Sequence, residues 1–88
     1  MNEKEEFLRG IDSRFNKIYG QIKAIQKNID KNEDASCKDV IYQIKATRKA
    51  LKRISDLFIE RKINTSIDVN KKEFKDLKEA LELLSKEY

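Results

Sequence analysis

The sequence predicts an all-α protein, and three observations support this fold class. The 88 residues contain no Pro and only two Gly. Charged residues make up 41% of the chain, a share found in disordered segments and in long, solvated helices. Apolar residues recur every three or four positions along the chain, and this periodicity favours helices over disorder.

Residues 3–30 are predicted to form a first long helix. Its apolar positions, spaced by four and three, are Phe7, Ile11, Phe15, Ile18, Ile22, Ile25 and Ile29. Such a seam, kept over three heptads, is typical of a helix that packs along other helices. Asn2 with Glu5 suits the N-terminal cap. Gly20 costs about 1 kcal/mol relative to Ala inside a helix, so we expect another helix to approach closely there.

A second long helix is predicted to follow the connection at residues 31–35. Ser36 with Asp39 resembles a capping box, and the helix should run to about Ile63 or Asn64. Its predicted inner stripe is Val40, Ile44, Thr47, Leu51, Ile54 and Phe58. Asn70 and Glu73 predict the cap of a short third helix, with Phe74, Leu77, Leu81 and Leu84 facing inward.

Residues 1–88 show no linker or internal repeat, and we expect a single domain. One short helix cannot cover the apolar seams of two long ones. We therefore expect a homodimer in which paired hairpins form an antiparallel four-helix bundle.

The composition also limits where the protein acts. There is no apolar run of about 18 residues, and no secretory leader is visible, so neither a membrane span nor export is expected. The single Cys cannot form an internal disulfide, which fits the reducing cytoplasm. The net charge of +4 is uneven: residues 1–31 carry +2, residues 32–65 carry +3 and residues 66–88 carry −1. A positive front of this kind suits a polyanionic partner.

Basic residues are predicted to form rows along both long helices. Arg14, Lys17 and Gln21 share one face of the first helix by their spacing. The second helix carries a row consisting of Lys38, Lys45, Lys49 and Lys52, with Arg48 between this row and the apolar stripe. Such rows suit phosphates. No helix-turn-helix or zinc-finger pattern is present, and a solvated coiled-coil flank explains the same charges.

The spacing of several residues resembles the CsoR/RcnR/FrmR family of small helical repressors, which sense metals, formaldehyde or sulfur species. The matching features are residues 14–21 (RFNKIYGQ), Cys37 at the start of the second helix, Gln43 six residues later and Arg48 eleven residues later. The resemblance covers roughly residues 10–66. It implies operator DNA as a partner, a dimer that is usually paired into a homotetramer, and DNA contacts at Arg14 and Arg48. Together with the basic rows, the predicted DNA-binding residues are Arg14, Lys17, Gln21, Lys45, Arg48 and Lys49.

The resemblance also implies that Cys37 is the sensing residue. A helix N-terminus and Lys38 both favour its thiolate, whereas Asp39 opposes it. The alternative is a small, buried and inert Cys. The family's copper site adds a His and a second Cys, at positions that are Lys62 and Ser66 in this chain.

The chain has no His and no second Cys, and one thiolate does not make a Cu(I) site. We therefore expect no tight metal binding and no cofactor. The formaldehyde-sensing members use a Pro amine at residue 2, which is Asn here; Lys62 remains as a candidate amine.

Two other classes of function are alternatives to a repressor. One is a helical structural or interaction protein that forms oligomers without binding DNA. The other is an enzyme, because residues 8–12 (LRGID) resemble the start of small helical chorismate mutases. That fragment is short, and no His or nucleophile constellation accompanies it, so the sequence predicts that the protein is not an enzyme.

Overall fold

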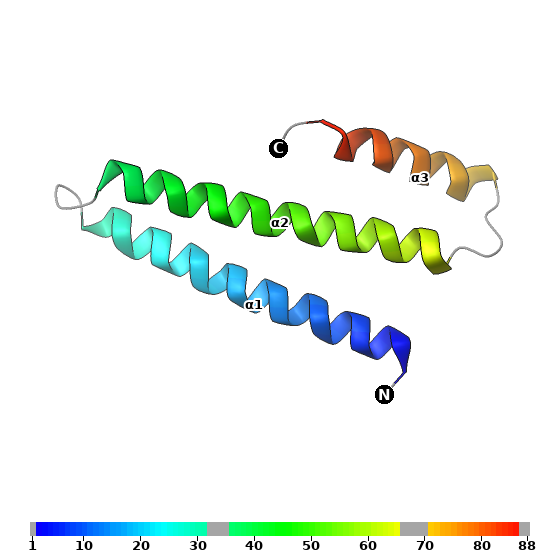
Figure 1. Cartoon of the computed structure of the whole chain (residues 1–88), viewed down its shortest axis with the longest axis horizontal. Helices are drawn as coiled ribbons and strands as arrows, with labels where there is room; N and C mark the ends of the chain where they lie inside the picture. Colours follow the sequence, from blue (N-terminus) through cyan, green and yellow to red (C-terminus); the bar gives the residue numbers. More distant parts are fainter. Residues whose placement is uncertain (1, 32–35, 66–70, 87–88) are drawn as a thin grey trace. The chain divides into compact units, whose positions relative to one another are not determined.

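The computed structural model describes residues 2–31, 36–65 and 71–86. They form three helices, α1 (Glu3–Asp30), α2 (Cys37–Thr65) and α3 (Lys71–Leu84) (Figure 1). The described residues include no strand, and the predicted all-α class with two long helices and one short helix is confirmed.

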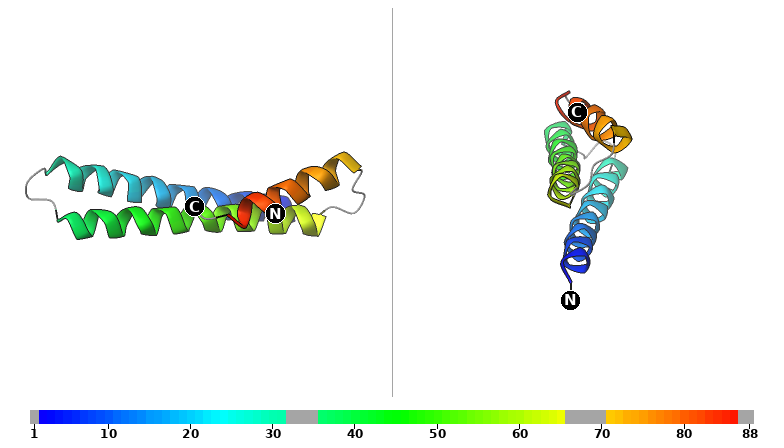
Figure 2. Two further views of the ribbon diagram at one scale, coloured as in Figure 1. Left: turned by 90° about the horizontal axis from the view of Figure 1, so that it is seen from above. Right: turned by 90° about the vertical axis from the view of Figure 1, so that its right-hand side faces the viewer.

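The chain divides into two compact units, Met1–Leu51 and Lys52–Tyr88. The first unit holds α1 and the first half of α2, which run antiparallel to each other (Figure 1, Figure 2). The second unit holds the rest of α2 together with α3. A single domain over residues 1–88 stays a prediction, and each unit is described by itself.

The start of α1 is capped as predicted. The Asn2 side-chain oxygen accepts a hydrogen bond from the Glu5 amide at 2.8 Å, and the Asn2 side-chain nitrogen donates to the Glu5 carboxylate at 3.2 Å. The first turn carries three glutamates, which the positive end of the helix dipole favours. The Lys31 amide closes the other end by donating to the Asn28 carbonyl at 3.3 Å. These local bonds explain why the predicted bounds of α1 are confirmed.

The start of α2 also follows the prediction. The Ser36 hydroxyl oxygen accepts from the Asp39 amide at 3.3 Å, and the Ser36 carbonyl accepts from the Val40 amide at 3.1 Å. The helix continues to Thr65, slightly beyond the predicted end. Residues 32–35 of the connection predicted at 31–35, and the predicted cap at Asn70, lie outside the described residues.

The predicted seam of α1 is only partly covered within the chain: Phe7, Ile11 and Phe15 are half-buried. Ile18 is 3% exposed and Ile25 is half-buried, as expected. Ile22 and Ile29, however, are 47% and 50% exposed, while their polar neighbours Gln21 and Asn28 are half-buried. One neighbouring helix covers only part of an apolar stripe this wide, as expected for a single chain, and the burial of these two isoleucines in a dimer stays a prediction.

The same pattern occurs on the first half of α2. Thr47 is buried, and its hydroxyl donates to the Gln43 carbonyl at 2.9 Å, which satisfies the polar group. Gln43 is half-buried, whereas the predicted inner residues Ile44 and Leu51 are exposed. The contact between α1 and α2 therefore contains polar side chains, and an apolar strip beside it is left uncovered. The strip consists of Leu8, Tyr19, Ile22, Ile29, Ile41, Ile44 and Leu51.

The second unit has its own small core. Ile59 is buried, and Leu77, Ala80 and Leu84 of α3 are half-buried. Phe74 and Leu81 were predicted to face inward but are exposed, so the prediction was wrong for them within the chain, whereas Phe58 belongs to the α2 stripe that was expected to need a second copy. The cause is again a stripe wider than one neighbouring helix covers.

Gly20 has open space around it. A Cβ built on this residue would meet no heavy atom within 4 Å. The predicted close approach of another helix therefore does not occur among the described residues of this chain. None of the described helices combines the length and apolarity that a membrane span requires.

Candidate nucleic-acid interface

Positive charge is concentrated in two segments of the first unit, residues 13–31 and 37–51. These segments contain nine basic and two acidic residues. The basic residues are Arg14, Lys17, Lys23, Lys27, Lys31, Lys38, Lys45, Arg48 and Lys49, and the acidic ones are Asp30 and Asp39. All eleven are exposed. Among the described residues, none of these nine cations forms an ion pair within 4.0 Å. Exposed cations without carboxylate partners attract polyanions.

The predicted DNA-binding residues on α1 have different environments. Arg14 and Lys17 are exposed. Gln21 is half-buried, and its side-chain oxygen is buried without a hydrogen-bond partner in the described part of the chain. A buried oxygen left unsatisfied costs about 1–3 kcal/mol. Gln21 therefore lies closer to the contact between α1 and α2 than its two basic neighbours do.

The predicted residues on α2 are all exposed cations: Lys45, Arg48 and Lys49. Lys52 continues this row into the second unit, but it differs from the others. Its ammonium lies 3.7 Å from a carboxylate oxygen of Asp56, one turn further along the helix. The free part of the row on α2 therefore ends at Lys49.

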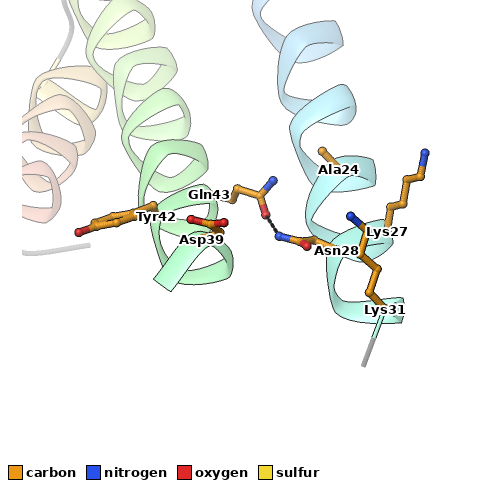
Figure 3. A pocket seen from close by; sticks show the side chains of 7 residues that line it. All are labelled: Ala24, Lys27, Asn28, Lys31, Asp39, Tyr42 and Gln43. Atoms are coloured by element: carbon orange, nitrogen blue, oxygen red, sulfur yellow. Dashed lines mark hydrogen bonds between the residues drawn. The ribbon is translucent and has the colours of Figure 1, made fainter. Parts of the chain in front are cut away.

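A side-chain hydrogen bond joins the two helices at the loop end of the hairpin, where α1 ends and α2 begins. The Asn28 side-chain nitrogen donates to the Gln43 side-chain oxygen at 3.0 Å (Figure 3). An open groove of about 570 Å³ surrounds this bond, lined by Ala24, Lys27, Asn28, Lys31, Asp39, Tyr42 and Gln43. In Figure 3 the Asp39 carboxylate lies at the first turn of α2, and the Tyr42 ring points away from α1.

Sequence reasoning missed this groove. A signal was present, since Gln21 and Asn28 are seven residues apart and form a polar line directly beside the isoleucine seam. Polar side chains at a predicted helix–helix contact need partners, and the amide of Gln43 on α2 is such a partner for Asn28.

Cys37 is the first residue of α2, and it is a free, exposed cysteine. The alternative of a buried Cys is therefore not what the structure shows. Lys62, the other predicted sensing residue, is exposed in the second unit, where its ammonium lies 5.9 Å from the centre of the Phe58 ring. Over the described ranges, no three His, Cys, Asp or Glu side chains cluster in a way that would hold a metal ion.

Fold and charge together define a small all-α protein whose first unit carries a surplus of exposed, unpaired cations among the described residues. Residues 9–86 match the sequence family described as metal-sensitive transcriptional repressor, and the chain belongs to this family. The resemblance to the CsoR/RcnR/FrmR proteins is thereby confirmed, over a longer stretch than predicted. The protein has the role of a transcriptional repressor, and the prediction that it is not an enzyme is confirmed because this is not a family of enzymes. Comparisons with curated proteins and with solved structures gave no match.

The family implies a response to metal ions, and the donor set of this chain does not fit one. Soft ions such as Cu(I) require several thiolate or imidazole donors. The chain supplies one thiol, at Cys37, and no imidazole. Lys62 and Ser66 stand where the resemblance predicts the remaining copper ligands, and Ser66 lies outside the described residues.

Proposed function

We propose that this protein is a DNA-binding repressor of the CsoR/RcnR/FrmR type with a degenerate metal site. The observation that carries the proposal is the surplus of exposed, unpaired cations on residues 13–31 and 37–51. Its operator contacts are assigned to Arg14, Lys17, Gln21, Lys45, Arg48 and Lys49. The two guanidinium groups suit two phosphate oxygens each, and the lysines add point charges.

The DNA-binding form is proposed to be a homodimer or homotetramer. The first unit leaves five aliphatic side chains of its uncovered strip, Ile22, Ile29, Ile41, Ile44 and Leu51, between 36% and 52% exposed. Contiguous apolar surface of this kind marks an interaction site, and its burial contributes about 25 cal/mol per Å². A second copy of the chain presents the same strip, so the two strips complement each other around a twofold axis.

The sensing step is proposed to be covalent chemistry at Cys37. A single exposed thiol reacts with an electrophile, an aldehyde or an oxidant without needing further ligands. Lys62 remains a candidate amine for an aldehyde adduct. Added bulk or charge at the first turn of α2 would shift α2 against α1 and thereby move the cations of the two helices relative to each other. DNA affinity would then fall through ordinary linkage between the two sites.

The test is titration of the DNA upstream of the protein's own gene at several salt concentrations. The wild type should bind, with an affinity that falls steeply as salt rises. Arg14→Ala with Arg48→Ala should reduce the magnitude of the slope of log K against log salt by about 0.9 for each lost phosphate contact. Lys75→Ala with Lys78→Ala on α3 removes the same charge from exposed positions and serves as the matched control.

Two results would count against the proposal. If no upstream fragment binds even at low salt, a structural or interaction protein without DNA affinity becomes the better description. If both double variants lower the slope equally, the interface on α1 and α2 is not specific.

A further inference from the structure

The basic rows of the first unit continue beyond the predicted DNA-binding residues to the loop end of the hairpin. On α1, Lys17, Ala24 and Lys31 are seven residues apart. Seven residues are nearly two helical turns, so successive members drift by only about 20° around the helix. Lys17 and Lys31 therefore share one side of α1, separated by about 21 Å along its axis. Lys38 and Lys45 have the same spacing on α2.

Lys27 and Lys31 are the cations that line the groove at this end. Both are exposed, and neither has an ion-pair partner among the residues that the structure describes. In Figure 3 the Lys31 side chain extends back toward Asn28, whereas the Lys27 side chain extends from α1 on the side away from α2. The hydrogen bond between Asn28 and Gln43 is partly buried and links α1 to α2. Its α1 partner, Asn28, follows Lys27 directly, and its α2 partner, Gln43, lies two residues before Lys45.

The groove suits an extended phosphate backbone better than a small anion enclosed within it. The Asp39 carboxylate lines the groove, so it repels an anion held on the groove floor. The Tyr42 ring points away from α1 and is 63% exposed, so it does not close over a small ligand. The lysines rise from α1, where a phosphate of a bound duplex can approach without entering the groove.

We propose that Lys27 and Lys31 form a second set of DNA phosphate contacts, and that the hydrogen bond between Asn28 and Gln43 positions them against the cations of α2. This inference rests on the proposed repressor function and extends its DNA surface over the whole of α1 after Arg14. The two lysines bind the phosphates directly. Asn28 and Gln43 act as positioning residues, since their amides hold the two helices at a fixed separation.

The test compares Lys27→Ala/Lys31→Ala with Lys4→Ala/Arg9→Ala on the upstream DNA. Both variants remove two exposed cations from α1, but Lys4 and Arg9 precede Arg14 and do not line the groove. The groove variant should reduce the magnitude of the salt slope by about 1.8 for each copy that contacts DNA, while the control variant changes it by less than half as much. Far-UV circular dichroism should show both variants folded, because all four positions are exposed.

A second comparison tests the positioning residues. Asn28→Ala should weaken DNA binding without changing the salt slope, because it removes no charge. The exchange of the two amides in Asn28→Gln/Gln43→Asn keeps their combined length and should restore affinity. The positioning role would be overturned if Asn28→Ala binds DNA more weakly only because it has lost helix content, and if Asn28→Gln/Gln43→Asn does not restore the affinity.

The outcomes separate this inference from the proposed function. If the wild type fails to bind any upstream DNA, both are wrong. If the wild type binds and the groove and control variants have equal salt slopes, only the contacts at Lys27 and Lys31 are refuted. If citrate raises the melting temperature of the wild type but not that of the Lys27/Lys31 variant, while the DNA slopes stay equal, the groove binds a small anion and the proposal is likewise overturned.

Discussion

The two compact units contain similar numbers of basic residues but arrange them differently. Residues 52–88 hold nine basic and eight acidic residues, and Lys52 is paired with Asp56 there. Within the first unit, residues 13–31 and 37–51 hold nine basic and two acidic residues, with no ion pair among the described residues. The first unit as a whole holds eleven basic and eight acidic residues, so the two units differ in where their acidic residues lie along the chain more than in their number. Cations that lie apart from carboxylates keep their field for a partner, which is why the proposed DNA surface is assigned to the first unit.

The largest expected effect comes from breaking the apolar strip of the first unit. Ile22→Asp should dissociate the oligomer and unfold it, because burial of a charge at the interface is strongly unfavourable and the monomer has little core of its own. Leu83→Asp on α3 is the matched control in the second unit, since Leu83 is exposed as well. Sedimentation and circular dichroism measure both properties. A wild type that is a folded monomer at micromolar concentration would contradict the proposed assembly.

The next effect concerns the sensing residue of the first unit. Treatment with N-ethylmaleimide should alkylate Cys37 and weaken DNA binding. A coupling free energy of the usual size between the two sites lowers the DNA affinity by about tenfold or more. Cys37→Ser should bind DNA like the wild type and be insensitive to the reagent. Mass spectrometry verifies the adduct. Unchanged DNA affinity after complete modification would show that Cys37 is not a sensor.

The metal prediction is checked on the same protein. Cu(I), Ni(II), Co(II) and Zn(II) should bind weakly, because Cys37 is the only thiol and the chain has no His. Competition with a chelator of known affinity measures this. Stoichiometric Cu(I) binding at sub-nanomolar affinity would refute the proposed degeneracy of the site.

A smaller effect should follow from freeing a cation in the second unit. Asp56→Ala removes the carboxylate that holds Lys52, which is seven residues after Lys45 on the same helix. If pairing is what separates the two units, the magnitude of the DNA salt slope should increase by up to about 0.9 per copy. The lost pair itself contributes only about 0.3–0.5 kcal/mol, because both side chains are partly exposed. Glu60→Ala changes the net charge equally and is the control.

The smallest effect tests the open space at Gly20. Gly20→Ala should stabilise α1 by about 1 kcal/mol, because a Cβ meets nothing nearby and Ala is the better helix former. Gly10→Ala has the same open surroundings and should behave alike. Thermal unfolding measures both. Stabilisation by Gly10→Ala alone would show that a second copy approaches α1 at Gly20.

The sequence by itself determined the secondary structure and the family. Asn2 and Ser36 cap α1 and α2 through bonds to residues three positions away, so the helix starts follow from local chemistry. The spacing of residues 14–21, Cys37, Gln43 and Arg48 pointed to the repressor family, which the match over residues 9–86 confirms.

Only the tertiary structure decided which side of each apolar seam is buried. Gln21 and Ile22 are adjacent in sequence and both lie near the seam, yet the polar one is half-buried and the apolar one is exposed. The hydrogen bond between Asn28 and Gln43 joins residues 15 positions apart. Such contacts depend on where a second helix lies around the first. The spacing within one helix defines a stripe but does not define the part of that stripe that its neighbour covers.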